Sequence, residues 1–400
     1  MKNKFLFLGI AAALFIACES DDTSDIVIND NSVTTTNNNT GGDPDPSENT
    51  VNLSGVFTEN LTLDGDIEYI ITGPVLMSAG TTLTVPAGMT IKAEPVGVNA
   101  YIAILQGARI IADGEPDAPI VFTSNAATPS SGDWGGIVMC GRAPINSTAD
   151  GSDDTSTTEV GGLSFGGNMP ADNSGVLEYV RVEYAGGAID GNAELNGVSI
   201  YGVGSGTTID FVQDFEGSDD GFEFFGGTVD ASHLVVVNSE DDSIDWTEGF
   251  IGSITDVYVQ HGDSHDKAFE CDGYNTDFSN EAGYFSAPTV TNVTIVGDGT
   301  DDGDEAIRLR AGTQGTFTNV VINNYDEGFD LDGDAGDNPT GQGVLDDLLN
   351  IVDVTFNNVT TTLKNDTGFV FDEADIISGA GNGTGTDVAT WGAGWTVGIN

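Results

Sequence analysis

Pairs of carboxylates recur at a nearly constant spacing in the second half of this chain. Asp219-Asp220 and Asp241-Asp242 lie 22 residues apart, and each pair is followed by a small residue and then by alternating apolar residues. Two carboxyl groups held about 6.5–9.5 Å apart can act as general acid and general base in an inverting glycoside hydrolase. Neighbouring or next-but-one coils of a repeat protein would supply that separation.

Basic residues near these pairs suggest a second chemistry. Arg308, Arg310 or Lys267 could act as the base of a polysaccharide lyase, with calcium on nearby carboxylates acidifying a uronate proton. The catalytic candidates are Arg308, Arg310, Lys267, Asp241 and Asp242. The two arginines could equally serve only to neutralise the carboxylates around them, which are Glu270, Asp272, Asp330 and Asp332.

Two glycine-bearing loops, at 298–304 and 330–337, are rich in carboxylates and could bind calcium. Calcium takes six to eight oxygen ligands at about 2.3–2.6 Å. The second loop resembles the start of an EF-hand loop, but its glycine falls one place late, at Gly336, and Gly341 stands where that motif needs glutamate. Solvated acidic turns are the alternative interpretation. The predicted metal ligands are Asp298, Asp301, Asp302, Asp304, Asp330, Asp332, Asp334 and Asp337.

A short motif that repeats seven times between Leu195 and Phe371 must position these residues. It consists of a mostly acidic pair, a small residue, then Phe, Ile or Val, a variable residue and a large apolar residue. The motifs start 24, 22, 25, 38, 22 and 40 residues apart, so four intervals are 22–25 residues and the other two contain an insertion. A fixed period of this length indicates a solenoid.

Apolar residues alternate within each motif, as in a strand with one buried face. Short strand-like segments precede most motifs, and no segment long enough for an amphipathic helix occurs between 195 and 371. The repeat therefore predicts an all-β, single-stranded parallel β-helix with coils of 22–25 residues. One buried column is expected to contain Phe222, Ile244, Phe269, Ile307, Phe329 and Phe369.

The variable residues of the motif should then point outward and stack about 4.8 Å apart. An unneutralised column of carboxylates at this spacing would repel strongly, so protonation, the two arginines or metal ions must offset the charge. The predicted outward column is Ser199, Glu223, Asp245, Glu270, Arg308, Asp330 and Val370.

Two aromatic residues, Tyr201 and Phe225, are expected to be outward neighbours that could stack on a sugar or a peptide, although ordinary aromatic stacking on the sheet is the alternative. Trp246 and Cys271 fall in an inward column and are expected in the core. The predicted ligand-binding residues are Tyr201, Phe225, Glu270, Asp272, Arg308 and Arg310.

The charge of the chain excludes some classes of partner. Its 64 acidic and 10 basic residues leave too little positive charge for nucleic acid or for an anionic membrane surface. Solubility at a cell surface or in salt water is the simplest interpretation of this acidity.

The N-terminus predicts export and lipid anchoring. Residues 1–17 contain two lysines and an apolar segment, as in a secretory signal. Leu14-Phe-Ile-Ala-Cys18 resembles a bacterial lipobox, which implies a lipid on Cys18, and Glu19-Ser-Asp-Asp22 resembles the acidic tract that directs Bacteroidetes-type lipoproteins to the outer face of the outer membrane. Residues 18–50 read as a lipidated, disordered acidic tether and 51–400 as one β-helix domain.

Several segments together resemble the parallel β-helix lipoproteins of Bacteroidetes, within the pectin-lyase-like superfold. They are Gly80–Gly88, Pro119–Ser124, Gly132–Val138 and Asp219–Gly227. The resemblance implies a right-handed coil and an outer-membrane location, while Trp391–Trp395 breaks the repeat and is expected to cap the last coil.

The favoured interpretation is a surface-anchored, calcium-associated protein that binds a glycan, a protein or a neighbouring outer-membrane complex. A lyase or hydrolase acting on acidic polysaccharide is the alternative. The Gly-His-Gly and Arg-Ile-Lys signatures of polygalacturonase-type hydrolases are missing from the sequence, and this weighs against catalysis.

Overall fold

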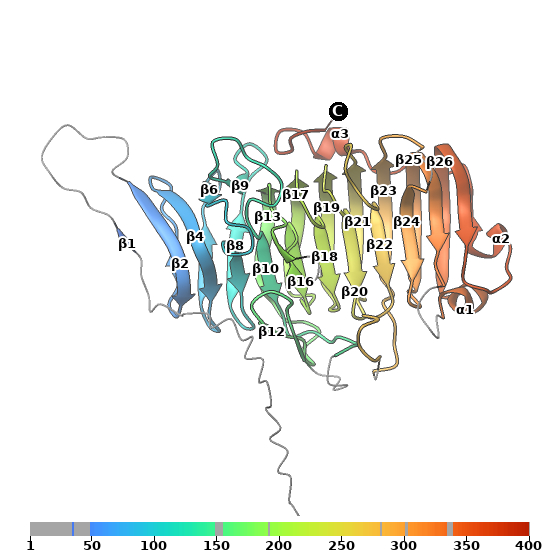
Figure 1. Cartoon of the computed structure of the whole chain (residues 1–400), viewed down its shortest axis with the longest axis horizontal. Helices are drawn as coiled ribbons and strands as arrows, with labels where there is room; N and C mark the ends of the chain where they lie inside the picture. The colour runs from blue at the N-terminus through green and yellow to red at the C-terminus, as the bar shows by residue number, and fades with distance from the viewer. Residues whose placement is uncertain are drawn as a thin grey trace, which may run out of the picture.

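The computed structural model describes residues 34–35, 49–148, 155–190, 193–280, 282–300, 303–333 and 339–399. These residues form a long solenoid of parallel strands, as expected for a right-handed parallel β-helix (Figure 1). Cys18 and most of the predicted tether lie outside the described residues. Thr34–Thr35 (β1) pairs antiparallel with Thr50–Phe57 (β2). No helix in the described part of the chain is long and apolar enough to cross a membrane.

The strands stack in three parallel ladders around the core. The first ladder runs through β4 (Glu68–Met77), β7 (Ile102–Ile104), β10 (Ile137–Cys140), β16 (Val198–Tyr201), β18 (Phe222–Phe225), β20 (Ile244–Thr247), β22 (Phe269–Asp272), β24 (Glu305–Arg310), β25 (Gly315–Leu331) and β26 (Leu349–Asn365). It carries the repeated motif on its outer face, so it is the part of the fold that positions the candidate site.

The other two ladders lie on the remaining sides of the coil. Parts of β2, β4, β25 and β26 also belong to these ladders. Their other strands are β3 (Leu61–Thr62), β5 (Thr82–Val85), β6 (Thr90–Ala93), β8 (Arg109–Asp113), β9 (Ile120–Ser124), β13 (Gly175–Glu183), β17 (Thr208–Phe215), β19 (Asp230–Val237), β21 (Ser253–Gln260), β23 (Thr289–Val296) and β27 (Ile377–Ser378). Two short antiparallel hairpins lie outside the ladders, β11 (Ser156–Thr157) with β12 (Ser164–Phe165) and β14 (Ala188–Asp190) with β15 (Ala193–Glu194).

From β13 onward, one long strand supplies both the second and the third ladder by bending at a residue with positive φ. That residue is Tyr179, Phe211, His233, Asp256, Asn292, Asn319 or Asp353 in successive coils. Asn and Asp tolerate this left-handed conformation better than most residues. The aromatic members gain from stacking, with ring centroids 4.4 Å apart for Tyr179–Phe211 and 4.0 Å for Phe211–His233.

The predicted inward column is confirmed over five coils, from Phe222 to Phe329, and every member is fully buried. Trp246 and Cys271 are buried as expected. The sixth member is wrong, because Phe329 pairs with Leu363 and not with Phe369. The last motif, Asp366–Phe371, follows the end of β26 and forms no strand, and its Val370 is 93% exposed.

The C-terminal cap is formed by other residues than predicted. The last coil is closed by α2 (Glu373–Ile376) and by β27, which pairs with Ile351 and Val352 of β26. The segment containing α3 (Val388–Trp391) instead turns back along the outside of the solenoid (Figure 1). There Trp395 packs edge-on against Tyr179 and Phe211, several coils away from the end. A third helix, α1 (Thr340–Leu345), lies between β25 and β26.

We expect Phe269→Ala to lower the free energy of unfolding by about 3–5 kcal/mol, because it opens a cavity in the middle of the stacked column. Val370→Ala removes an apolar side chain that is already in solvent and should change stability by less than about 0.5 kcal/mol. Chemical denaturation of both variants measures the difference. Equal stabilities would contradict the register.

Candidate functional site

The outer face of the first ladder changes character along the solenoid. One outward column, with one residue per coil, runs from apolar through acidic to mixed charge. Its members are Leu76, Ala103, Val138, Ser199, Glu223, Asp245, Glu270, Arg308, Asp330 and Lys364. The prediction of Val370 at the last position is wrong, because β26 places Lys364 there.

The apolar part of this face is covered by the excursion between β10 and β13. Ile145, Val160 and Phe165 of the excursion join residues of β4, β7, β10, β16 and β18 in a second hydrophobic cluster. Asn146 Nδ2 donates to the carbonyl oxygens of Gly273 and Tyr284, at 2.8 Å each, and so ties the excursion to the loop that follows β22. These loops border the acidic part of the face.

Tyr201 and Phe225 are adjacent, as predicted, but they are not exposed. Their rings stack with centroids 3.9 Å apart, and only 1% and 3% of their surfaces are accessible. Phe165 of the excursion covers Tyr201, and the centroids of their rings lie 4.8 Å apart. The expectation of a surface for stacking a sugar at these two residues is therefore wrong, and the alternative of aromatic packing on the sheet holds.

Carboxylates gather beyond the part of the face that the excursion covers. They lie on β18, β20 and β22, on the turns that precede β18 and β20, and at Glu194 of β15. We call the following residues the acidic cluster: Glu194, Asp219, Asp220, Glu223, Asp241, Asp242, Asp245 and Glu270. They form four overlapping groups of three, and in each group one oxygen per residue lies within 4.8 Å of the others. Asp245 belongs to two groups, and its Oδ1 is buried without a hydrogen-bond partner in the described structure.

Burial and mutual repulsion raise the pKa values of these carboxyl groups. For Asp219 burial is the main cause, followed by the charges of Glu194 and Asp241, and its pKa rises to about 8. The pKa values of Asp220, Glu223, Asp242 and Asp245 also lie well above the ordinary range, first because of burial and then because of neighbouring carboxylates. The cluster therefore holds protons near neutral pH, or it holds a cation in their place.

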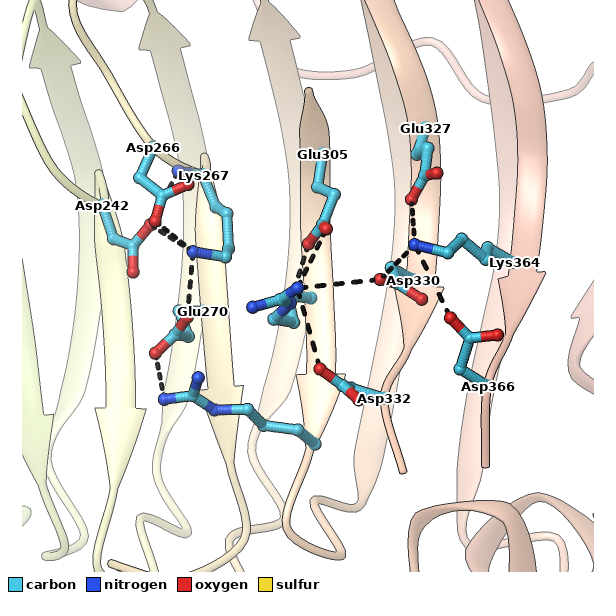
Figure 2. Close-up of polar contacts among 12 residues, drawn as sticks. Asp242, Asp266, Lys267, Glu270, Glu305, Glu327, Asp330, Asp332, Lys364 and Asp366 are labelled. Carbon is cyan, nitrogen blue, oxygen red and sulfur yellow. Dashed lines mark hydrogen bonds and ion pairs between the residues drawn. The ribbon is translucent and has the colours of Figure 1, made fainter. Parts of the chain in front are cut away.

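Lys267 is the basic residue nearest to the centre of the cluster and is itself buried. Its Nζ lies 3.0 Å from Glu270 Oε1 and 3.7 Å from Asp242 Oδ1, and it also contacts the Asp266 carboxylate (Figure 2). The carboxylates around it raise the lysine pKa, against the opposing effect of burial. A lysine held as a cation in this way is a poor general base.

The predicted arginines lie in the C-terminal part of the face, where acids and bases alternate. Arg310 contacts Glu270 and lies 2.5 Å from Asp272 Oδ1. Arg308 Nε lies 2.8 Å from Glu305 Oε2, and its Nη2 lies 3.7 Å from Asp332 Oδ2 and 4.0 Å from Asp330 Oδ2. The predicted pairing of these arginines with Glu270, Asp272, Asp330 and Asp332 is present in these contacts.

Lys364 extends this charge network by one coil and was missed in the sequence because the last motif was misplaced. Its Nζ lies 3.1 Å from Glu327, 3.2 Å from Asp330 and 3.6 Å from Asp366 (Figure 2). Asp330 is 1% exposed and Asp332 faces Arg308, so both belong to the network on the strand face. Calcium binding by this loop stays a prediction, because its other predicted ligands, Asp334 and Asp337, lie outside the described residues.

The rest of the predicted calcium ligands are only partly described. Asp301, Asp302, Asp334 and Asp337 lie outside the described residues. Asp298 and Asp304 do come together, but their third partner is His265, which was not predicted as a ligand. Glu248 was also missed. Burial raises its pKa to about 8, and its Oε1 accepts a hydrogen bond of 3.3 Å from Asn275.

Comparison with known proteins identifies the class. Residues 55–396 match the family described as pectate-lyase-like β-helix domain, and the chain belongs to this family. A search of curated proteins finds no match.

Solved structures with a similar fold include three catalytic domains, two of which are GH87 α-1,3-glucanases. The catalytic unit of a thermostable GH87 α-1,3-glucanase from Streptomyces thermodiastaticus strain HF3-3 is 10% identical with a TM-score of 0.35, covering 81% of this chain and 65% of that one. The Agl-KA catalytic domain is 14% identical with a TM-score of 0.30, covering 78% of this chain and 62% of that one. A GH87 α-1,3-glucanase catalytic domain in complex with nigerose is 12% identical with a TM-score of 0.28, covering 80% of this chain and 64% of that one. This chain thus spans less than two thirds of each, and the likeness is too distant to transfer an activity.

The raised carboxyl pKa values predict that stability falls as pH rises. Asp219 and Glu248 keep their protons up to about pH 8 in the folded chain, whereas in the unfolded chain they ionise near their ordinary values. The folded state therefore binds more protons between about pH 4 and pH 8, and its free energy of unfolding decreases across that range. Urea unfolding at several pH values, with chelator present, measures the slope. Asp219→Asn should flatten it, and an unchanged slope would contradict the assignment.

Proposed function

We propose that this protein is a lipid-anchored extracellular β-helix that binds calcium in the acidic cluster and, beside it, a glycan or protein ligand. The observation that carries the proposal is the acidic cluster, whose carboxylates form four overlapping sets of three. Among the described residues, the ion pairs that reach the cluster come from Lys267 and Arg310 and involve only Asp242 and Glu270. Lys267 contacts Asp242 and Glu270. It belongs to the coil after that of Asp242, whereas Asp220 and Glu223 belong to the coil before it.

The donor chemistry suits calcium. All ligands in the cluster are carboxylate oxygens, which hard cations such as Ca²⁺ prefer, and calcium tolerates the irregular arrangement that successive coils impose. The buried, unpartnered Asp245 Oδ1 is an oxygen that a cation would satisfy. A bound cation would also replace the protons that burial and repulsion otherwise force onto these groups.

The surroundings of the cluster suit an anionic or hydroxyl-bearing ligand. A calcium ion held by three or four carboxylate oxygens has coordination positions left for the hydroxyl or carboxylate oxygens of a glycan or an acidic peptide. Lys267 and Arg310 lie at the C-terminal side of the cluster and would contribute positive charge. The excursion and the loop after β22 border the site and would limit the orientation of the ligand.

Hydrolysis of a polysaccharide is the second candidate, and one observation favours it. Asp219, with a pKa of about 8, would be protonated at neutral pH and could act as a general acid next to the Asp241-Asp242 pair. The lyase mechanism is less well supported, because neighbouring carboxylates raise the pKa values of Arg308, Arg310 and Lys267, and all three stay protonated.

The calcium proposal predicts a cation-specific gain in stability. Calcium at a hundredfold excess over its Kd should add about 2.7 kcal/mol to the free energy of unfolding, since it binds only the native cluster. Sodium at equal ionic strength should add much less. Thermal melting of chelator-treated protein, with calcium or sodium added back, measures the effect.

Asp245→Asn should abolish the calcium effect, whereas Asp117→Asn, in an exposed turn far from the cluster, should retain it. A melting temperature indifferent to chelator and calcium would contradict the proposal. The same samples incubated with uronate-containing polysaccharides separate the two functions. New reducing ends that disappear in Asp219→Asn would favour the hydrolase.

Anchoring through Cys18 rests on the sequence alone and has its own test. Cys18→Ala should yield protein that incorporates no labelled fatty acid and is either released or kept as precursor, while the parent becomes labelled and sediments with membranes. Protease added to whole cells should digest the parent if the chain is displayed outside. Equal lipid labelling of both forms would exclude the anchor.

A further inference from the structure

His265 lies at the corner between β21 and β22 and is held with one ring nitrogen facing two carboxylates. Its side chain is only 7% exposed. Nδ1 lies 2.8 Å from the carbonyl oxygen of Asp266. A carbonyl oxygen can only accept, so Nδ1 carries a proton, and Nε2 is the nitrogen that faces the carboxylates.

Nε2 faces a carboxylate oxygen, which can only accept when it is ionised. Nε2 lies 3.2 Å from Asp298 Oδ1, and one oxygen each of Asp298 and Asp304 lies with a histidine nitrogen in a group whose members are within 4.8 Å of one another. Both aspartates belong to the connection between β23 and β24. Two acceptors at hydrogen-bond distance need either a proton or a cation between them.

The His265 ring is also held in place by packing on its face. His265 stacks on His261 with ring centroids 4.2 Å apart. His261 is buried. Its own Nδ1 lies 2.7 Å from the Tyr325 hydroxyl, and its own Nε2 lies 3.0 Å from Ser243 Oγ. A histidine whose other nitrogen donates to a backbone carbonyl and whose ring is fixed by packing has the arrangement typical of a metal ligand.

We propose that His265, Asp298 and Asp304 form a site for a divalent transition metal such as Zn²⁺, separate from the calcium-binding acidic cluster. One imidazole nitrogen and two carboxylate oxygens suit zinc and its neighbours better than calcium, which prefers oxygen ligands alone. Three protein ligands leave a position for water or for a ligand group. This replaces the calcium loop predicted at Asp298 and Asp304, and it requires neither Asp301 nor Asp302.

Such a site would link two connections on the same edge of the solenoid. The metal would join the corner before β22 to the connection before β24, one coil further along. Asp266 connects this site to the acidic cluster, because its carbonyl accepts from His265 and its carboxylate contacts Lys267. Metal binding would therefore fix the position of the carboxylate that holds Lys267.

The test is metal titration of the full chain after chelation. Isothermal titration with Zn²⁺, and the visible absorption of Co²⁺, should show one site that a large excess of Ca²⁺ does not displace. His265→Gln should weaken Zn²⁺ binding by at least about tenfold. His233→Gln is the matched control. His233 also faces two carboxylates, Asp210 and Asp256, but it lies in another ladder, so this variant should bind Zn²⁺ at His265 as tightly as the parent does.

Asp298→Asn provides a second variant at a side chain that is 34% exposed, so its fold should survive even if His265→Gln does not fold. It should also weaken Zn²⁺ while leaving the calcium effect on melting intact, so failure of this site and failure of the calcium proposal are distinguishable. Equal Zn²⁺ affinity in parent, His265→Gln and Asp298→Asn would overturn the proposal. So would a parent that binds no Zn²⁺, because a shared proton would then join His265 to Asp298.

Discussion

Parallel in-register stacking is the constraint on which the rest of this structure depends. Each residue lies about 4.8 Å from its equivalents in the neighbouring coils, so like side chains form continuous columns. In the interior this favours stability, because Phe222, Ile244 and Phe269 follow one another in one column and are fully buried. On the outer face the same geometry places Glu223, Asp245 and Glu270 in direct succession, and their repulsion cannot be relieved by moving one side chain away.

The outer face resolves this conflict in three different ways along its length. At the N-terminal end the column is apolar and the excursion covers it. At the C-terminal end Arg308 and Lys364 alternate with acids, so each cation bridges carboxylates of adjacent coils. In the middle region, between these two ends, the carboxylates are buried and have few cations near them. This middle region is where the fold leaves unneutralised charge, and such sites are commonly functional rather than structural.

The sequence predicted the columns well wherever the motif coincided with a strand, because alternation and period are local properties. It misplaced the final coil, since Asp366–Phe371 copies the motif while the true strand, ending in Leu363-Lys364-Asn365, lacks its acidic pair. It also placed Tyr201 and Phe225 in solvent. No periodic signal shows that Phe165, from a segment outside the repeat, covers them. The role of His265 depends on the meeting of two non-repetitive connections, which spacing alone does not reveal.

Insertions therefore determine where this repeat can acquire function. A regular coil offers only strand faces and short turns, and its columns vary slowly from one coil to the next. The excursion after β10, the loop after β22 and the connection before β24 break that regularity on the side of the first ladder. These insertions border the acidic column and add the imidazole of His265 and further carboxylates beside it. The column alone could not select a ligand. The combination of a rigid charged column with irregular neighbours gives a site both its electrostatic field and its shape.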